Sequence, residues 1–166
     1  TRLRAAVFIN AVAIRQAVSL SHGPILPPHC IRKLQTANYL LHSAINCTLA
    51  TVSSSWLAIT GPPRGLTFGL PTDTIDVGVG FPVDGVVEAT DDVTPFQTPG
   101  GRAVTYDHRG NYDHLSDVYA ELFAWIADHS LVRGDVVWEI YLTQPTPDAD
   151  PEDMITQIVV PVTDAV

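Results

Sequence analysis

The order strand, helix, strand, strand occurs twice along the 166-residue chain. In the second half the helix is the clearest element, because apolar residues from Leu115 to Ile126 are spaced alternately three and one apart, as on one helical face. Runs of β-branched and aromatic residues on both sides of it predict strands. The predicted elements of this half are a strand at 103–108, an N-cap at Asn111 or Asp113, a helix over 115–126 closed by Arg133-Gly134, and strands at 136–143 and 154–162.

The first half shows the same order with weaker signals. Pro27-Pro28 suits a helix start, because the N–H groups missing there would have no partner in the first turn. An apolar face at helical spacing continues to about Thr51, although many Ser, Thr, Asn and Cys residues give the segment poor helix propensity. Regular alternation from Ile75 to Phe81 predicts a half-buried strand. The predicted elements of this half are a strand within 7–20, a helix over about 28–51 and strands at 65–70 and 74–83.

The segment between the halves, residues 84–100, is rich in Pro, Gly and Asp, and this composition predicts a linker. Hydrophobic residues make up 46% of the chain, which is enough for a sizeable core. The sequence therefore predicts a single α+β domain over residues 1–166, built from two β-α-β-β repeats. Repeat one is expected at about 7–83 and repeat two at about 101–162.

A carboxylate lies in the middle of the predicted strand at 136–143, where a strand this apolar would normally carry Val or Thr. On a period of two, the faces of this strand are Trp138, Ile140 and Leu142, and Val137, Glu139 and Tyr141. The first face is apolar enough to lie under a helix. The second face combines a negative charge, a phenol and an isopropyl group, and it suits an apolar, positively charged ligand.

The two halves also align residue by residue, with 61–68 opposite 134–141 and no gap. This alignment matches Glu139 to Leu66, so the fold alone does not require the carboxylate. We therefore expect Glu139 to serve a ligand. The alternative is a carboxylate whose hydrogen bonds come from backbone donors or water.

Charge is distributed unevenly along the chain. Residues 1–72 contain six basic and no acidic residues, whereas all 18 carboxylates follow Thr72. Docking of oppositely charged halves explains this better than a nucleic-acid site, because the basic residues are dispersed and lack interleaved aromatic residues. No apolar run reaches the roughly 18 residues of a membrane-spanning helix. The sequence thus predicts no direct binding of nucleic acid by this chain and no membrane partner.

Signals for metal binding or catalysis are weak. The side chains with metal-ligand chemistry are His22, His29, Cys30, His42 and Cys47, and their spacing matches no standard zinc pattern. Asp107, His108 and His114 lie close together in sequence, but a turn of this kind usually carries solvated polar groups. No phosphate-binding loop or nucleophile elbow is present. We expect no metal and no cofactor and, with only two cysteines, a reduced cytoplasmic protein.

Four stretches of the chain resemble one known family. They are Gly101-Arg102-Ala103-Val104-Thr105-Tyr106-Asp107-His108-Arg109-Gly110-Asn111-Tyr112, Glu121-Leu122-Phe123-Ala124-Trp125-Ile126, Trp138-Glu139-Ile140-Tyr141-Leu142 and Val160-Pro161-Val162. Together they resemble the GyrI-like small-molecule-binding domain, the effector-binding module of multidrug-responsive transcription activators. The resemblance is specific over 101–162 and good over 61–84. It is poor over 22–55, where the family's acidic amphipathic helix has no counterpart.

The resemblance implies two repeats related by a pseudo-twofold axis, with antiparallel sheets, helices on one side and a ligand cleft between the repeats on the other. It also implies a buried glutamate that faces lipophilic cations among aromatic rings. This role carries over to Glu139, with Tyr141 adjacent and Tyr112 after the His-Arg-Gly turn. The predicted ligand-binding residues are Glu139, Tyr141, Tyr112, Trp138, Phe68 and Tyr106. Tyr112 could equally be a packing residue at the helix start, Trp138 is expected in the core, and Tyr106, like Tyr119, is more often a core or rim aromatic than a ligand contact.

The function expected from this resemblance is binding of amphipathic, cationic small molecules by the effector domain of a transcription regulator. Two alternatives stay open. The chain is a hydrolase of electrophilic, cyclopropane-type genotoxic compounds if Glu139 activates a water molecule, or a gyrase-inhibitor-like module that binds proteins through its acidic surface. No helix-turn-helix precedes the domain in this sequence, so a DNA-binding part is expected in a separate segment, or the chain acts alone.

Overall fold

A computed structural model of the chain describes residues 2–6, 11–16, 58–69, 76–86, 89, 94–143 and 150–165. The predicted helix over 28–51 lies outside the described residues. Within them, one sheet accompanied by one α-helix and a 3-10 turn confirms the α+β class. The elements are β1 (Arg2–Ala6), β2 (Ala11–Gln16), β3 (Ala58–Ile59), β4 (Arg64–Phe68), β5 (Asp76–Asp84), β6 (Thr94–Phe96), β7 (Gly101–Arg109), α2 (Leu115–Asp128), β8 (Leu131–Arg133), β9 (Val136–Tyr141), η1 (Pro151–Asp153) and β10 (Ile155–Asp164).

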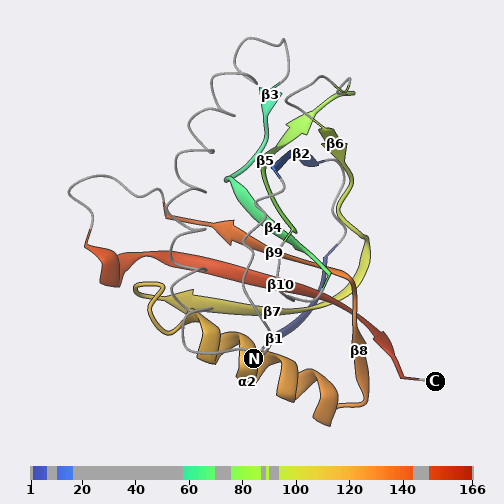
Figure 1. Ribbon diagram of the computed structural model, residues 1–166, viewed down its shortest axis with the longest axis vertical. Helices are drawn as coiled ribbons and strands as arrows, with labels where there is room; N and C mark the ends of the chain where they lie inside the picture. The colour runs from blue at the N-terminus through green and yellow to red at the C-terminus, as the bar shows by residue number, and fades with distance from the viewer. Residues whose placement is uncertain are drawn as a thin grey trace, which may run out of the picture.

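The strands form one antiparallel sheet in the order β1-β7-β10-β9-β4-β5-β2-β6, with β3 added to β5 and β8 added to β10. The order is the same when it is read outward from the centre in either direction (Figure 1). Outward from β4 the neighbouring strands are β5 and then β2, and outward from β9 they are β10 and then β7. This is the order that two strand-helix-strand-strand repeats produce. The pseudo-twofold axis and the helix of the first repeat stay predictions.

The predicted residue alignment between the halves is wrong by one position. It matched Glu139 to Leu66, but Leu66 pairs with Trp138 and therefore points to the other face of the sheet. The residue that pairs with Glu139 is Gly65. Alternation allowed the error, because a gapless shift of one residue preserves the apolar pattern while exchanging the faces. Two hydrogen bonds take equivalent places in the two halves: Thr60 N donates to Pro82 O (2.9 Å), and Gly134 N donates to Pro161 O (2.8 Å). They match Thr60 to Gly134, and the corrected alignment therefore matches Gly65 to Glu139.

The helix α2 packs on one face of the β7-β10-β9 part of the sheet. Its buried residues Leu115, Leu122 and Ile126 form a core with strand residues that include Val137 and Ile158. Among the described residues, the helix that covers β9 is α2, and it lies on the Val137 face, which Glu139 shares, rather than on the Trp138 face. Both faces of β9 are apolar enough to be buried, so the strand pattern alone does not determine which one the helix covers.

The opposite face of the sheet carries a second core. Trp138 is 1% exposed and packs with Leu66, Ala103, Ile140 and Val159. Both faces of the central strands are therefore buried, which explains the near-continuous apolar run of β9. The prediction that Trp138 is a core residue is confirmed.

Three local features differ from expectation. Residues 94–96, inside the segment predicted as a linker, form β6 and pair with β2. The helical segment does not continue to Arg133, because α2 ends at Asp128 and Arg133 belongs to β8. The N-cap of α2 is His114 and makes no side-chain capping hydrogen bond. Asn111 instead accepts a hydrogen bond from Asp113 N at 2.9 Å, so it orders the turn before the helix.

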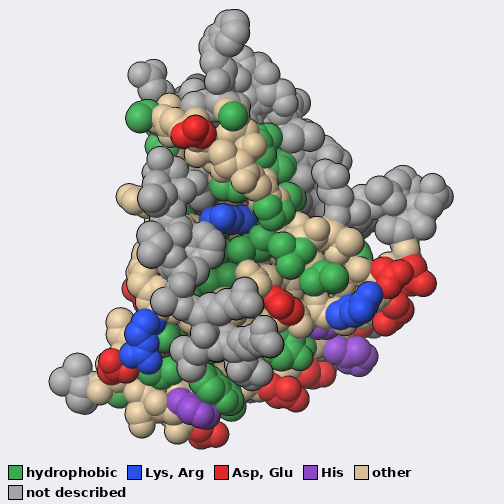
Figure 2. All heavy atoms as spheres, turned by 180° about the vertical axis from the view of Figure 1, so that it is seen from behind, with side chains coloured by type: hydrophobic (Ala, Val, Ile, Leu, Met, Phe, Trp, Pro, Cys, Tyr) green, Lys and Arg blue, Asp and Glu red, His purple; other side chains and the backbone are tan. Residues whose placement is uncertain are grey.

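Acidic side chains lie mainly at the margins of one face of the molecule (Figure 2). In Figure 2, apolar groups occupy the middle of the face seen from behind, and Asp and Glu groups gather mainly along its lower and right-hand margins. The ion pairs Arg102–Asp164 (2.6 Å) and Arg109–Asp153 (3.3 Å) both lie within the second half and are exposed, so each contributes little to stability. The basic strand β1 pairs with β7 of the acidic half. Among the described residues, no helix has the length and apolar character needed to cross a membrane.

Candidate functional site

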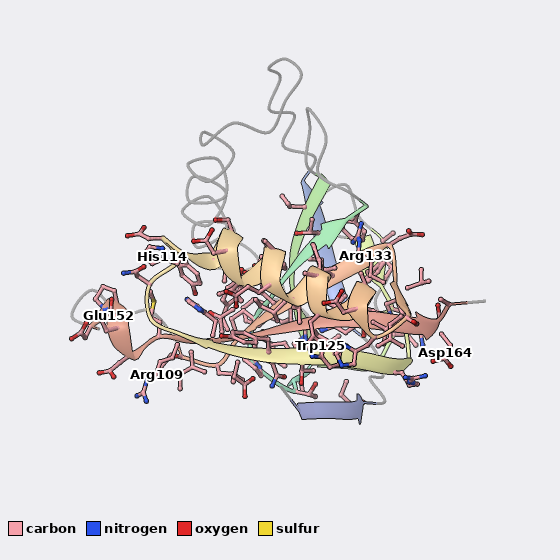
Figure 3. All side chains as sticks on the ribbon, turned by 90° about the horizontal axis from the view of Figure 1, so that it is seen from below. Arg109, His114, Trp125, Arg133, Glu152 and Asp164 are labelled. Carbon is pink, nitrogen blue, oxygen red and sulfur yellow. The ribbon has the colours of Figure 1, made fainter. Side chains whose placement is uncertain are left out.

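Glu139 lies near the centre of the sheet, on β9 between β10 and β4. Its ladder partners are Ile158 on β10 and Gly65 on β4. Residues directly opposite each other in an antiparallel ladder point to the same face, so all three share the face that α2 covers. The Glu139 side chain keeps partial solvent contact. The labelled charges of Figure 3, by contrast, lie at the two ends of α2 and of the sheet, with Arg109, His114 and Glu152 at one end and Arg133 and Asp164 at the other.

Both carboxylate oxygens of Glu139 accept hydrogen bonds from phenols. Tyr119 Oη donates to Oε1 at 2.7 Å, and Tyr141 Oη donates to Oε2 at 2.9 Å. Tyr119 comes from the sheet-facing side of α2, whereas Tyr141 is two residues along the same strand and therefore on the same face. The carboxylate is thus held by one donor from the helix and one from its own strand. Each oxygen keeps a further lone pair for a ligand.

Burial dominates the electrostatics of this group. It raises the pKa of Glu139 above the usual value, because a charge is less stable away from water. The hydrogen bonds from Tyr119 and Tyr141 oppose this rise, and the nearby His108 also opposes it. Burial and the negative charge of Glu139 raise the pKa of Tyr119 and of Tyr141 well above the usual phenol value. Both phenols therefore stay protonated and act as donors around neutral pH.

Aromatic and apolar side chains surround this carboxylate on one side. The rings of Tyr112 and Tyr141 meet edge to face at 6.5 Å, and Tyr112 Oη shares a hydrogen bond with Thr156 Oγ1 at 3.0 Å. Tyr141 is 2% exposed and packs with Val79 and Phe81 of β5. We call Glu139, Tyr119, Tyr141 and Tyr112 the Glu139 group. It offers one negative charge among three phenol rings.

The structure brings together three of the six residues predicted to bind ligand, namely Glu139, Tyr141 and Tyr112. Tyr106 lies on the same face as Glu139, with Ile158 between them, and packs into the core under α2. Trp138 and Phe68 lie on the opposite face of the sheet. Phe68 meets Phe96 edge to face at 5.2 Å, and both residues pack against the core that contains Trp138. Neither Trp138 nor Phe68 is part of the Glu139 group.

Sequence reasoning missed Tyr119, which it treated as a packing residue. The available signal was the hydroxyl itself. Tyr119 lies in the apolar stripe of α2, and a phenol pointed into a core needs a hydrogen-bond partner. The face of β9 that carries Glu139 offers that acceptor once α2 is known to pack there.

The other polar candidates do not converge. His108 is 9% exposed and its Nε2 donates to the backbone oxygen of Asn111 at 2.7 Å, which fixes a proton on that nitrogen. Asp107 is exposed and accepts a hydrogen bond from Gln157. His114 is exposed and lies 3.7 Å from Asp117. Among the described residues, no three His, Cys, Asp or Glu side chains are grouped as metal ligands, and the predicted His22 to Cys47 set lies outside them.

Replacing Tyr119 with Phe is expected to raise the pKa of Glu139 further. The hydroxyl of Tyr119 stabilises the ionised carboxylate, and Phe removes that donor while keeping the ring. The pKa can be measured by following the side-chain carboxyl carbon of Glu139 by NMR during a pH titration. Tyr106→Phe is the matched control, because Tyr106 is on the same face without a bond to Glu139. An unchanged or lower pKa in Tyr119→Phe would contradict this assignment.

The family model of the GyrI-like small molecule binding domain matches residues 70–163. Comparison with curated protein sequences gives no significant match. The matched segment contains all four residues of the Glu139 group.

Solved structures share the fold of this chain. The crystal structure of the EcmrR C-terminal domain superposes with a TM-score of 0.71 at 18% identity, covering 99% of this chain and 100% of that one. The cryo-EM structure of an EcmrR–DNA complex in EcmrR-RPo gives a TM-score of 0.76 at 19% identity, covering 99% of this chain and 57% of that one. The chain thus spans little more than half the length of EcmrR in that complex.

Two further structures extend the comparison. SAV2435 bound to tetraphenylphosphonium superposes with a TM-score of 0.65 at 13% identity, covering 98% of this chain and 93% of that one. A hydrolase from Listeria innocua gives a TM-score of 0.58 at 16% identity, covering 98% of this chain and 91% of that one. At these identities the likeness establishes the fold.

Proposed function

This chain belongs to the GyrI-like small-molecule-binding domain family, and from that premise we propose that it binds amphipathic organic cations, with Glu139 as the countercharge. The observation that carries the proposal is the pair of phenol hydrogen bonds to the two oxygens of Glu139, in a partly buried aromatic setting. They hold the carboxylate in one orientation and favour its ionised form. A fixed negative charge among aromatic rings matches a positive, apolar ligand.

The energetics favour a cation over an anion or a neutral polar ligand. Burial makes the ionised Glu139 costly, and a cation bound beside it offsets that cost directly. Contact of the cation with the ring of Tyr112 or Tyr141 would add about 0.5–2 kcal/mol. Neither interaction requires one ligand shape, so we expect broad selectivity. The tetraphenylphosphonium bound to SAV2435, which shares the fold, supports this ligand class.

We further propose that the chain acts as the effector-binding domain of a cytoplasmic transcription regulator, with the ligand in a cleft between two repeats. The likeness to the C-terminal domain of EcmrR, which occurs in a complex with DNA, supports this role. In this proposal the ligand changes the affinity of a separate DNA-binding segment, and this chain contributes the sensing part. The described Glu139 group lies where the two halves of the sheet meet, on β9 beside β4.

The affinity for a permanent cation is expected to fall as the pH is lowered from 7 through the raised pKa of Glu139. The pKa of Glu139 in the folded protein is raised above 4.5 by burial, so protonation removes the countercharge at a higher pH than for an exposed carboxylate. Calorimetric titration with tetraphenylphosphonium, whose own charge does not change, measures this directly. Triphenylphosphine oxide is the neutral control. Cation affinity that does not depend on pH over this range would contradict the proposal.

A hydrolase of electrophilic compounds is the second candidate. One specific observation favours it: a partly buried carboxyl group with a raised pKa lies beside two phenol donors, and such a group can exchange protons with a substrate or water. The fold shared with a hydrolase from Listeria innocua is compatible with this reading. Mass spectrometry of each compound after incubation separates the two functions. A cation recovered intact supports binding, whereas a hydrolysed electrophile whose turnover requires Glu139 identifies an enzyme.

A further inference from the structure

His108 is a buried polar residue that the cation binding proposed above does not use. It lies on β7, on the face of the sheet that α2 covers, because it pairs with Thr156 and Thr156 pairs with Tyr141. The preceding residues of β7 on this face, Val104 and Tyr106, pack in the apolar core under α2. A histidine buried at the next position costs free energy unless its ring nitrogens find partners. The partner of His108 therefore indicates its role.

That partner is the backbone carbonyl oxygen of Asn111, which lies 2.7 Å from His108 Nε2. A carbonyl oxygen can only accept, so the imidazole donates to it. The same carbonyl belongs to the planar peptide group that joins Asn111 to Tyr112. A hydrogen bond from a buried ring on the sheet fixes the plane of this peptide, and with it the direction in which the Tyr112 side chain leaves the backbone. His108 thus holds the backbone of Tyr112 to β7.

The side chain of Tyr112 is held at its other end. Its Oη shares a hydrogen bond with Oγ1 of the buried Thr156 on β10 at 3.0 Å. Its ring meets the ring of Tyr141, which donates to Glu139, edge to face at 6.5 Å. Tyr112 keeps partial solvent contact, so a ligand can reach its ring. The ring is therefore accessible and at the same time fixed beside the carboxylate.

Other hydrogen bonds of the turn between β7 and α2 hold the side chain of Asn111 instead. Asn111 Nδ2 donates to Glu152 Oε1 at 3.0 Å, and Asn111 Oδ1 accepts from Asp113 N at 2.9 Å. Both of these bonds are exposed, whereas the bond from His108 is partly buried. A hydrogen bond away from water is electrostatically stronger than an exposed one. We therefore expect the orientation of the Asn111–Tyr112 peptide to depend mainly on His108.

We propose that His108 is a positioning residue for the ligand, because its bond to the Asn111–Tyr112 peptide keeps the ring of Tyr112 in place to contact a cation beside Glu139. This inference rests on the cation binding proposed above and adds a residue that acts on that binding through Tyr112. A ring that is already ordered loses little freedom when the cation binds, so the contact contributes fully to affinity. Without the bond, binding must also order the turn, and affinity falls.

The test is calorimetric titration of tetraphenylphosphonium with His108→Leu and His108→Gln. Leucine fills the position without a donor, whereas the glutamine amide reaches about as far as the imidazole Nε2 and donates without a charge. His108→Leu is expected to lower affinity about threefold to tenfold, within the range of a cation–ring contact, and His108→Gln less than about twofold. Rescue by glutamine assigns the effect to the hydrogen bond. His108→Phe, a ring without a donor, serves the same comparison if the leucine variant does not fold.

Tyr112→Leu and the double variant show whether His108 acts through Tyr112. Tyr112→Leu removes the ring and is expected to lower affinity at least as much as His108→Leu does. Adding His108→Leu should lower it no further, because the ring that His108 positions is already absent. His114→Leu is the matched control, since His114 is exposed at the same end of the sheet as Glu152 (Figure 3), and its replacement should leave affinity unchanged.

Three results would overturn the positioning role. They are wild-type affinity in His108→Leu, even with a lower melting temperature; an equal loss of affinity in His108→Gln; and losses from His108→Leu and Tyr112→Leu that multiply in the double variant. All three leave the proposed cation binding intact, because they are measured against a wild-type protein that binds tetraphenylphosphonium. A wild-type protein that does not bind this cation would overturn the proposed function itself and this inference with it.

Discussion

Replacement of Glu139 with Gln is expected to lower the affinity for tetraphenylphosphonium by about tenfold or more, the loss that follows when a charged partner leaves a buried interaction. The amide keeps the size of the side chain and can still accept one of the two phenol hydrogen bonds. We expect no loss of stability at pH 7. Burial raises the pKa of Glu139 in the folded state, so above that pKa the ionised group costs more in the folded protein than in the unfolded chain. Neutral Gln lacks that cost.

The measurement is calorimetric titration together with the melting temperature at pH 7 and pH 4. The stability advantage of Gln over Glu is expected at pH 7 and should shrink as the pH falls below the folded pKa, because Glu139 is then also neutral. Glu121→Gln is the matched control, since Glu121 is exposed on α2 and its replacement changes the net charge equally. An equal loss of affinity in both variants would assign the effect to overall charge rather than to Glu139.

Replacement of Trp138 with Ala is expected to lower the free energy of unfolding by about 3–5 kcal/mol, the usual cost of removing a large buried aromatic side chain. Trp138 is 1% exposed and packs with Leu66, Ile140 and Val159 on the face of the sheet opposite Glu139. The loss of packing therefore concerns the core and not the ligand. The milder Trp138→Phe variant keeps an aromatic ring there and is expected to change cation affinity by less than about twofold, as for sites with no shared contacts.

Urea unfolding of Trp138→Ala measures the loss in the free energy of unfolding, and calorimetric titration of Trp138→Phe measures the cation affinity. Trp125→Ala serves as the comparison, because Trp125 is only partly buried and stacks on the exposed His129. Trp125→Ala should lower the free energy of unfolding clearly less than Trp138→Ala does. A Trp138→Phe protein of normal stability with strongly reduced cation affinity would show that Trp138 contacts the ligand after all.

The elements of the second half followed from the sequence, because their signals are local. The spacing of apolar residues predicted α2, and its observed bounds, Leu115–Asp128, extend only two residues beyond the predicted end. Alternation correctly divided β9 into two faces. It did not show which face α2 covers, since Val137 and Trp138 are both apolar and the choice depends on long-range packing. Short strands such as β6 and β8 were missed, because three residues carry no periodic signal.

The same distinction applies to the Glu139 group. Glu139 and Tyr141 were predicted together because they are two residues apart on one strand, and that spacing alone puts them on one face. Tyr119 was missed because its bond to Glu139 depends on how α2 crosses the sheet. Phe68 was predicted as a ligand-binding residue, but its pairing with Val136 puts it on the face of the sheet opposite Glu139. Ladder register decides which side chains meet, and the sequence pattern does not determine it.

The edge strand β1 has a consequence for how this chain folds. β1 opens the chain, yet it pairs with β7, so that Arg2 lies opposite Thr105, whereas the next strand, β2, joins the other half of the sheet beside β5. The N-terminal strand therefore completes the second half, whose other strands come after residue 100, whereas β2 to β6 of the first half all lie within residues 11–96. Closing a loop of about a hundred residues before any pairing is gained makes such contacts slow to form. We expect the two halves to unfold as one cooperative unit, despite the repeated order of their strands.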